Sequence, residues 1–311
     1  MGSGRLPTGQ AGPAWVNGRL VGESEPSLSL LERGLTLGDG VFETILAAGT
    51  KLFRPTEHLE RLARGASLLA IDLPPAEQLL AAMLDTLSAN QLSAAVVRLT
   101  VSRGPDSGRG LDVSPDIAPT VIVRVSPHEL RTPGGAGLAA VFSPIRRNES
   151  SPLSRVKCLS YADNVLARLE ARRRGADDAV LLNTAGEVCC ASAANLFVVK
   201  GGTLTTPPGE SGALPGVTRH CVLELAAARR LTVREAPVLP DDLWAADEAF
   251  LTNTVTGVAG LTSVEGRSIG TGRLGEVTRL LAADRQRLVD SSLAMDSEGR
   301  LSAPGQIGGQ P

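Results

Sequence analysis

The chain of 311 residues contains three lysines, and one of them lies where a reactive amine would be expected. Lys51 and Lys200 stand beside turn signals, where a solvated ammonium is ordinary. Lys157 lies among small and apolar residues, just before a long amphipathic segment. A lysine, unlike an arginine, can lose its proton and attack a carbonyl carbon once its surroundings lower its pKa. On position alone, a surface lysine at a helix start is the simpler interpretation, so Lys157 needs support from other features.

Three further segments have the chemistry of anion sites. Val217 and Thr218 open a predicted helix after Gly216, so free backbone N–H groups and a hydroxyl could point at an anion. Thr254 follows an apolar predicted strand, where polar groups are well placed to bind a ligand. Arg61 lies early in another predicted helix and could grip a phosphate with two N–H groups. Each segment alone is equally well explained as a helix start, a turn or a solvated arginine.

The elements that must position these side chains fall into two groups. The first, residues 14–130, has hairpins at 14–20 and 40–54, helices from Pro55 and Pro75, and strands at 94–102 and 119–125, an order that predicts an α+β domain. The second, residues 131–290, begins in a Gly-rich segment and has predicted helices at 162–174, 217–229 and 275–288, with strands at 178–182, 187–190, 196–200, 232–236 and 248–251. We predict that residues 1–13 and 291–311 are disordered.

The composition excludes several classes of protein. Hydrophobic residues make up 42% and charged residues 21%, as in a globular protein, and the net charge of −2 gives no attraction to nucleic acid or to an anionic membrane. We expect a cytoplasmic protein, because neither a membrane span nor a secretory signal is present. The four cysteines lack metal-ligand spacing, and the adjacent Cys189 and Cys190 would face opposite ways in a regular strand. We therefore expect no metal site.

Together, the segments resemble the class IV aminotransferase family, the fold-type-IV enzymes that use pyridoxal phosphate. This family includes branched-chain and D-amino-acid transaminases and 4-amino-4-deoxychorismate lyase. The matching segments are residues 33–44, 58–62, 157–171, 194–197, 206–208, 216–219 and 251–254, in the order of the family. The resemblance implies a two-domain α+β fold, with a smaller N-terminal α/β domain and a larger C-terminal domain built on a mixed sheet or barrel. It also implies a homodimer.

The resemblance further implies roles for individual residues. Lys157 would be the lysine that forms the Schiff base with the cofactor and then moves the α-proton of the substrate. The cofactor would be bound by Arg61, Tyr161, Val217, Thr218 and Thr254, and the substrate by Phe42.

Cys190 departs from the family pattern. Counting four residues from Gly186, or back five from Asn195, places Cys190 where the family has the glutamate that contacts the pyridine nitrogen. A carboxylate there favours the protonated ring, whereas a neutral thiol does so much less. Glu187 is three residues away and would point to the other face of a strand. We therefore expect transamination to suffer more than elimination.

Two arginines bear on the choice of reaction. Arg103 and Arg109 lie in a Gly-rich segment that is similar to the substrate region of the lyases, and could meet the two carboxylates of that substrate. A solvated loop explains them equally well. The first expectation is 4-amino-4-deoxychorismate lyase, which releases pyruvate and leaves 4-aminobenzoate. The alternatives are an amino-acid transaminase, which would also take a small carboxylate-bearing substrate, and a catalytically impaired homologue with a binding role.

Overall fold

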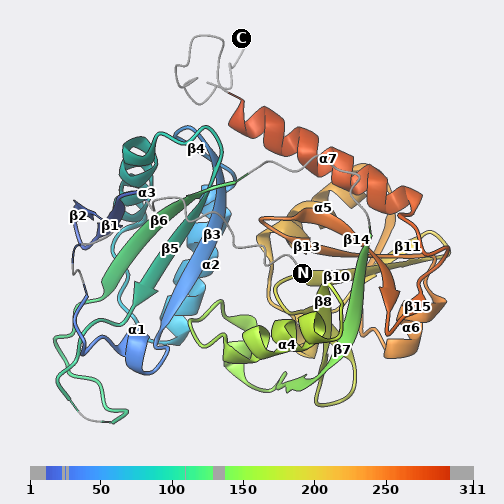
Figure 1. The fold of residues 1–311 in the computed structure, drawn as a ribbon, viewed down its shortest axis with the longest axis horizontal. Coiled ribbons are helices and arrows are strands. Elements are labelled where there is room, and N and C mark those ends of the chain that lie inside the picture. The colour runs from blue at the N-terminus through green and yellow to red at the C-terminus, as the bar shows by residue number, and fades with distance from the viewer. Residues whose placement is uncertain (1–11, 23–24, 26–27, 109, 129–136, 295–311) are drawn as a thin grey trace, which may run out of the picture.

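The fold is seen in a computed structural model that describes residues 12–22, 25, 28–108, 110–128 and 137–294. Two domains lie side by side, each built on its own sheet, and the last helix crosses above them toward the first domain (Figure 1). Among the described residues, no helix has the length and apolar character needed to cross a membrane. The predicted two-domain α+β fold is confirmed, and the C-terminal sheet is mixed.

The first domain has a six-stranded antiparallel sheet in the order β2-β1-β6-β5-β3-β4. Its strands are β1 (Ala14–Val16), β2 (Arg19–Val21), β3 (Gly40–Ala48), β4 (Lys51–Leu52), β5 (Ala95–Ser102) and β6 (Thr120–Pro127), and its helices are α1 (Arg33–Thr36), α2 (Pro55–Leu68) and α3 (Ala76–Asn90).

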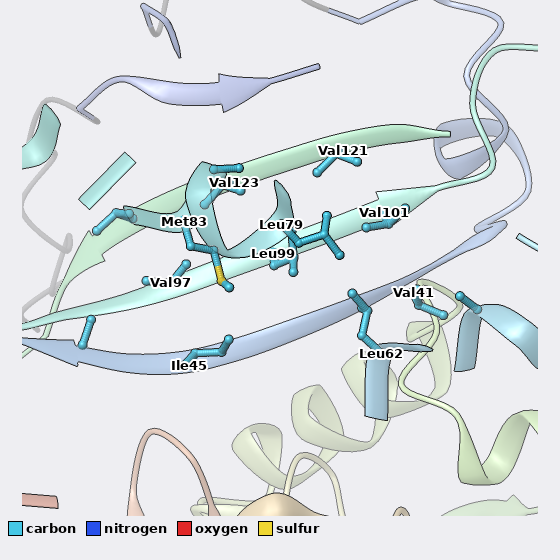
Figure 2. Close-up of a cluster of buried hydrophobic side chains, with 14 of the residues drawn as sticks. Val41, Ile45, Leu62, Leu79, Met83, Val97, Leu99, Val101, Val121 and Val123 are labelled. Atoms are coloured by element: carbon cyan, nitrogen blue, oxygen red, sulfur yellow. The ribbon is translucent and has the colours of Figure 1, made fainter. Parts of the chain in front are cut away.

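The two faces of this sheet have different tasks, because successive side chains of a strand point to opposite sides. Val97, Leu99 and Val101 of β5 are fully buried in a core with Leu62 of α2 and Met83 of α3 (Figure 2). The intervening Arg98 of β5 and the neighbouring residues of β3 are left for the other face, which turns toward the second domain. This alternation supplies one wall of the candidate site described below.

The second domain has a nine-stranded mixed sheet in the order β12-β11-β10-β13-β14-β7-β8-β9, with β15 beside β14. Its strands are β7 (Leu138–Arg147), β8 (Asp178–Asn183), β9 (Val188–Ala191), β10 (Asn195–Lys200), β11 (Thr203–Thr206), β12 (Thr232–Glu235), β13 (Glu248–Asn253), β14 (Gly257–Val264) and β15 (Arg267–Ser268). Its α-helices are α4 (Ala162–Arg173), α5 (Val217–Ala228), α6 (Pro240–Ala245) and α7 (Glu276–Leu293), and short 3₁₀ helices span Pro152–Arg155 and Gly209–Ser211.

Helix α7 differs from its prediction. It continues to Leu293, beyond the predicted end at 288 and into the segment from 291 that was predicted to be disordered. The reason is tertiary packing, because Val289 and Leu293 are buried against Leu46 and Phe53 of the first domain. This apolar contact between the domains fixes the last turns of the helix. Residues 295–311 and 1–11 lie outside the described part of the chain.

Candidate functional site

A cavity of about 410 Å³ lies between the two domains, a volume typical of sites for small ligands. Ten residues were predicted for the site, and eight of them line this cavity: Phe42, Arg61, Lys157, Tyr161, Cys190, Val217, Thr218 and Thr254. They come from β3 and α2 of the first domain, and from the segment before α4, β9, the start of α5 and the loop after β13 in the second. The fold therefore gathers residues that are up to 212 positions apart.

The backbone of Lys157 is held by the first domain. Strand β4 pairs only with Ala47 and Ala48, so the first half of β3 keeps free hydrogen-bonding groups on that edge. The segment from Lys157 to Leu159 takes them: the Phe42 N–H donates to the Lys157 carbonyl at 2.9 Å, and the Leu159 N–H donates to the Gly40 carbonyl at 2.9 Å. A Cβ on Gly40 would lie 2.7 Å from the Leu159 side chain, so this close approach requires glycine.

The surroundings of the Lys157 amine favour its neutral form. Burial and the nearby Arg61 guanidinium lower the pKa of Lys157 to about 8. The Nζ atom lies 4.3 Å from the centroid of the Phe42 ring and 5.5 Å from that of the Tyr161 ring. Within the described residues, no carboxylate forms an ion pair with it. A substantial neutral fraction at neutral pH makes this amine a competent nucleophile and base.

Arg61 joins the two domains at one end of the cavity. Its Nε and Nη2 atoms donate to the two oxygens of Glu43, each at 2.7 Å, and its Nη1 donates to the carbonyl of Pro215 at 3.1 Å. His58 Nδ1 is also 2.7 Å from Glu43. Pro215 lies just before helix α5, so the guanidinium is brought against the start of that helix. Positive charge and free backbone N–H groups therefore meet at one place.

The start of helix α5 is shaped for a small anion. Gly216 is the N-cap residue, and having no side chain it makes no capping hydrogen bond. A Cβ there would lie 2.1 Å from the Asn195 amide oxygen, so only glycine allows this packing. The first helical residues, Val217 and Thr218, are buried in the cavity wall and leave their N–H groups without helical partners. An anion bound here would satisfy them.

Cys190 lines the cavity, but the strand around it is not regular. Cys190 pairs with Leu181 while Val188 pairs with Leu182, so Cys189 is an extra residue in a β-bulge. The bulge brings the two sulfur atoms to 3.4 Å, which corrects the expectation that the two cysteines face opposite ways. A hydrogen bond from the Cys189 thiol lowers the pKa of Cys190. Glu187 lies elsewhere: its carboxylate accepts from Asn183 and Ser211.

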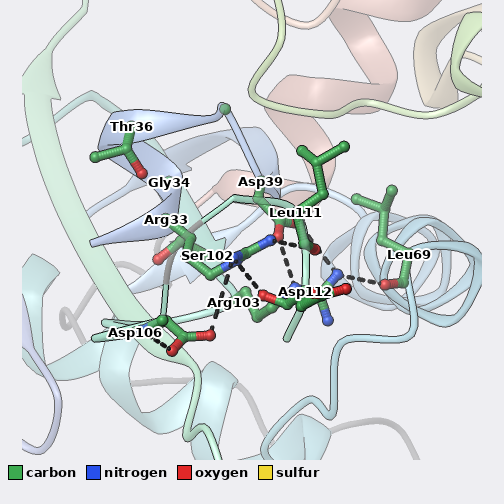
Figure 3. A network of polar contacts seen from close by, with 12 residues as sticks. Arg33, Gly34, Thr36, Asp39, Leu69, Ser102, Arg103, Asp106, Leu111 and Asp112 are labelled. Carbon is green, nitrogen blue, oxygen red and sulfur yellow. Dashed lines mark hydrogen bonds and ion pairs between the residues drawn. The ribbon is translucent and has the colours of Figure 1, made fainter. Parts of the chain in front are cut away.

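The structure does not bring Arg103 to the cavity. Its guanidinium is bound by the Asp39 carboxylate, with Nε at 2.6 Å, and by the carbonyls of Leu69 and Ala70 (Figure 3). Asp39 also pairs with Arg33, so the network ties loops of the first domain together. The side chain of Arg103 is 11% exposed, and its donors are engaged away from the cavity. Arg109, the other arginine predicted for the substrate, lies outside the described residues.

Sequence reasoning missed two polar groups in the cavity wall. Arg98 lies with its Cζ atom 3.2 Å from the centroid of the Phe42 ring, and no carboxylate in the described residues pairs with it. Burial lowers its pKa to about 10, so it stays charged at neutral pH. The Thr252 hydroxyl is buried and has no hydrogen-bond partner. The alternation of β5 could have revealed Arg98, because an arginine among buried valines must face the other side of the sheet.

The cavity fits a pyridoxal phosphate. An aldehyde needs a nearby neutral amine, which Lys157 provides. A phosphate needs cations and N–H donors, which Arg61 and the start of helix α5 provide together. The unpartnered hydroxyl of Thr252 gives the cavity wall a further polar group for a ligand.

Comparisons with known proteins agree with this geometry. The family model described as amino-transferase class IV matches residues 40–264. A protein of Methanocaldococcus jannaschii, provisionally named a branched-chain-amino-acid aminotransferase, is 36% identical over 269 residues, covering 86% of this chain and 93% of its own. The branched-chain amino acid aminotransferase of Escherichia coli superposes with a TM-score of 0.84 at 28% identity, over 93% of this chain and 97% of its own.

A third structure bears on the cofactor. Another bacterial-type branched-chain amino acid aminotransferase, solved with pyridoxamine 5'-phosphate, also has a TM-score of 0.84, at 28% identity, over 93% of this chain and 96% of its own. The similarity in sequence spans nearly the whole chain, and the cavity carries the groups that the cofactor of such enzymes needs. The chain therefore belongs to the class IV aminotransferases, which are pyridoxal-phosphate-dependent enzymes.

Proposed function

We propose that this enzyme is an amino-acid transaminase of the branched-chain type. The observation that carries the proposal is the sequence similarity to proteins of that name over more than four fifths of the chain. The comparisons thus support the alternative better than the lyase that was our first expectation. The arginines were the argument for the lyase, and Arg103 is committed to Asp39 instead. The presence of Lys157, Arg61 and Thr218 in one cavity argues against a purely binding homologue.

The residues of the chain divide the work of such a reaction. Bound pyridoxal phosphate supplies an aldehyde carbon and an electron-withdrawing ring. Arg61, Val217, Thr218 and Thr254 would hold its phosphate. Lys157 Nζ, with its lowered pKa, would accept the α-proton of the amino acid and return it to the neighbouring carbon. Tyr161, whose pKa is raised by burial, would remain a neutral hydrogen-bond donor beside the ring.

The cavity also has the features needed to recognise an amino acid. The uncompensated guanidinium of Arg98 can bind a carboxylate, and a bond of this charge-assisted kind contributes about 1.5–3 kcal/mol. Phe42, Tyr161 and Val255 add apolar surface for a hydrocarbon side chain. These contacts suit a substrate with a carboxylate at one end and an apolar group at the other.

The test combines cofactor trapping with a choice of substrates. Borohydride reduction of the protein with pyridoxal phosphate should add the pyridoxyl mass at Lys157, and Lys157→Ala should abolish it. Branched-chain amino acids should then yield their keto acids only when a keto-acid acceptor is present. Release of pyruvate from 4-amino-4-deoxychorismate without an acceptor would instead establish the lyase.

We also propose that two copies of the chain associate through an apolar patch near α1. Leu30, Leu35 and Leu111 are 86%, 70% and 81% exposed. Leu111 lies beside α1, because its carbonyl accepts from Arg33 (Figure 3). Such a patch is unusual for a monomer, and a second copy would cover it. Sedimentation should show a dimer, and Leu35→Asp with Leu111→Asp should shift it toward the monomer; a monomeric parent protein would refute the proposal.

A further inference from the structure

Glu43 is the most completely buried carboxylate of the first domain, and it has no place in the chemistry outlined above. It is 0% exposed in the middle of β3, on the face that packs against α2. Its neighbours on β3, Phe42 and Thr44, point the other way and line the cavity, whereas Glu43 itself does not. A buried charge is retained at considerable desolvation cost, so its partners indicate its purpose.

All the partners of Glu43 are arranged around Arg61. One oxygen accepts from Arg61 Nε and the other from Arg61 Nη2, both at 2.7 Å, which is the two-point contact that fixes the plane of a guanidinium. His58 Nδ1, one turn earlier on α2, lies 2.7 Å from the second oxygen. Burial alone would raise the pKa of Glu43, but His58 and Arg61 outweigh it and lower the pKa to about 2, so the carboxylate is ionised at neutral pH.

The remaining donors of Arg61 show what this clamp accomplishes. The Pro215 carbonyl accepts one hydrogen from Nη1 at 3.1 Å. Two N–H groups, one on each terminal nitrogen, then remain without a protein acceptor. Arg61 lines the cavity together with Val217 and Thr218, so these hydrogens face the free N–H groups at the start of α5. Rotation of the guanidinium would turn them away, and Glu43 blocks that rotation.

We propose that Glu43 is a positioning residue that holds Arg61 in the orientation that grips the cofactor phosphate. The proposal rests on the proposed phosphate site and adds a requirement to it. Glu43 touches neither cofactor nor substrate, and it acts only through Arg61. Its effect should therefore be confined to ligands that carry the phosphate.

The test compares pyridoxamine phosphate with pyridoxamine, which differ only in the phosphate and cannot form an imine with Lys157. The ratio of their dissociation constants, measured by calorimetry on the apoprotein, isolates the grip on the phosphate. In Glu43→Asp the charge remains but the shorter side chain cannot reach both nitrogens, and the ratio should fall about 10- to 100-fold, as when a ligand-orienting residue is removed. Glu43→Gln should lower it as well. Binding of pyridoxamine itself should change little.

A purely electrostatic role predicts a different pattern. Removing a negative charge near the phosphate would raise the ratio in Glu43→Gln, and Glu43→Asp would match the parent protein. Either result overturns the proposal. Glu32 provides a matched control: it is 3% exposed in the same domain, accepts 2.7 Å hydrogen bonds from Ser102 and Thr120, and lies away from the cavity. Glu32→Gln should lower stability but leave the ratio unchanged, and a ratio lowered equally there would also refute a specific role for Glu43.

The outcome separates this proposal from the proposed function. If borohydride labels Lys157 but the ratio in Glu43→Asp equals that of the parent protein, the enzyme assignment stands and the role of Glu43 is wrong. If the parent protein itself does not discriminate between the two ligands, the phosphate site fails, and the role of Glu43 fails with it.

Discussion

Replacing Lys157 with methionine should stabilise the apoprotein, in a way that depends on pH. Burial and Arg61 lower the pKa of this lysine from 10.5 to about 8, so the folded protein binds its proton less tightly than the unfolded chain does. At 1.36 kcal/mol per pH unit, this corresponds to roughly 3 kcal/mol of unfavourable free energy below pH 8. Water at the cavity mouth screens the ammonium, so we expect a gain of about 1.5 kcal/mol in Lys157→Met at pH 7.

The sign of the pH dependence is fixed. Between pH 8 and pH 10.5 the unfolded chain holds the proton that the folded protein has released, so the stability of the parent protein rises with pH in this window. The advantage of Lys157→Met should therefore shrink across it. Urea unfolding of the apoproteins at pH 7 and pH 10 measures the difference. Lys200→Met, at an exposed position, is the control and should show no such trend. An advantage that is absent at pH 7, or that grows with pH, would refute the reasoning.

Three further substitutions test other parts of the site. Cys190→Glu places a carboxylate where the resemblance puts the contact to the ring nitrogen, so the ratio of transaminase to lyase turnover should rise; an unchanged ratio would show that Cys190 does not influence the ring. Arg98→Met removes the free cation of the cavity and should raise the KM of carboxylate substrates about 10- to 100-fold, with little change in the unfolding midpoint. Arg103→Met should lower the free energy of unfolding by about 3 kcal/mol, because it leaves the partly buried Asp39 with one partner fewer, while KM stays unchanged. A KM that rises there would return Arg103 to the substrate site.

The success of the sequence analysis depended on local signals. Lys157, the start of helix α5 and the loop at Thr254 each carry a recognisable short pattern, and the fold gathers them without any change to their local structure. Strands β7, β11 and β14 were not predicted as such, because their residues are interspersed with Gly, Ser and Thr and pair with strands distant in sequence. The end of helix α7 was wrong because Leu46 and Phe53, more than 200 residues away, determine it.

The errors at the site have the same origin. Arg103 was assigned to the substrate because a Gly-rich segment suggested a binding loop, but its partner Asp39 lies 64 residues earlier. The cysteine pair was expected to follow the regular alternation of a strand, and an extra residue in the bulge overrides it. Arg98 was overlooked because its importance lies in the absence of a partner. Such absences become visible only when the neighbouring elements are in place.

The attachment of the reactive lysine to β3 limits how this enzyme can move. Its peptide is bonded to a strand of one lobe, while its side chain faces a ligand cradle built largely from the other. A hinge that parted the lobes would tear the amine away from its target and break the β-bridge between Val41 and Cys158. Substrate must therefore enter and leave past loops at the rim, with the two halves staying together throughout turnover.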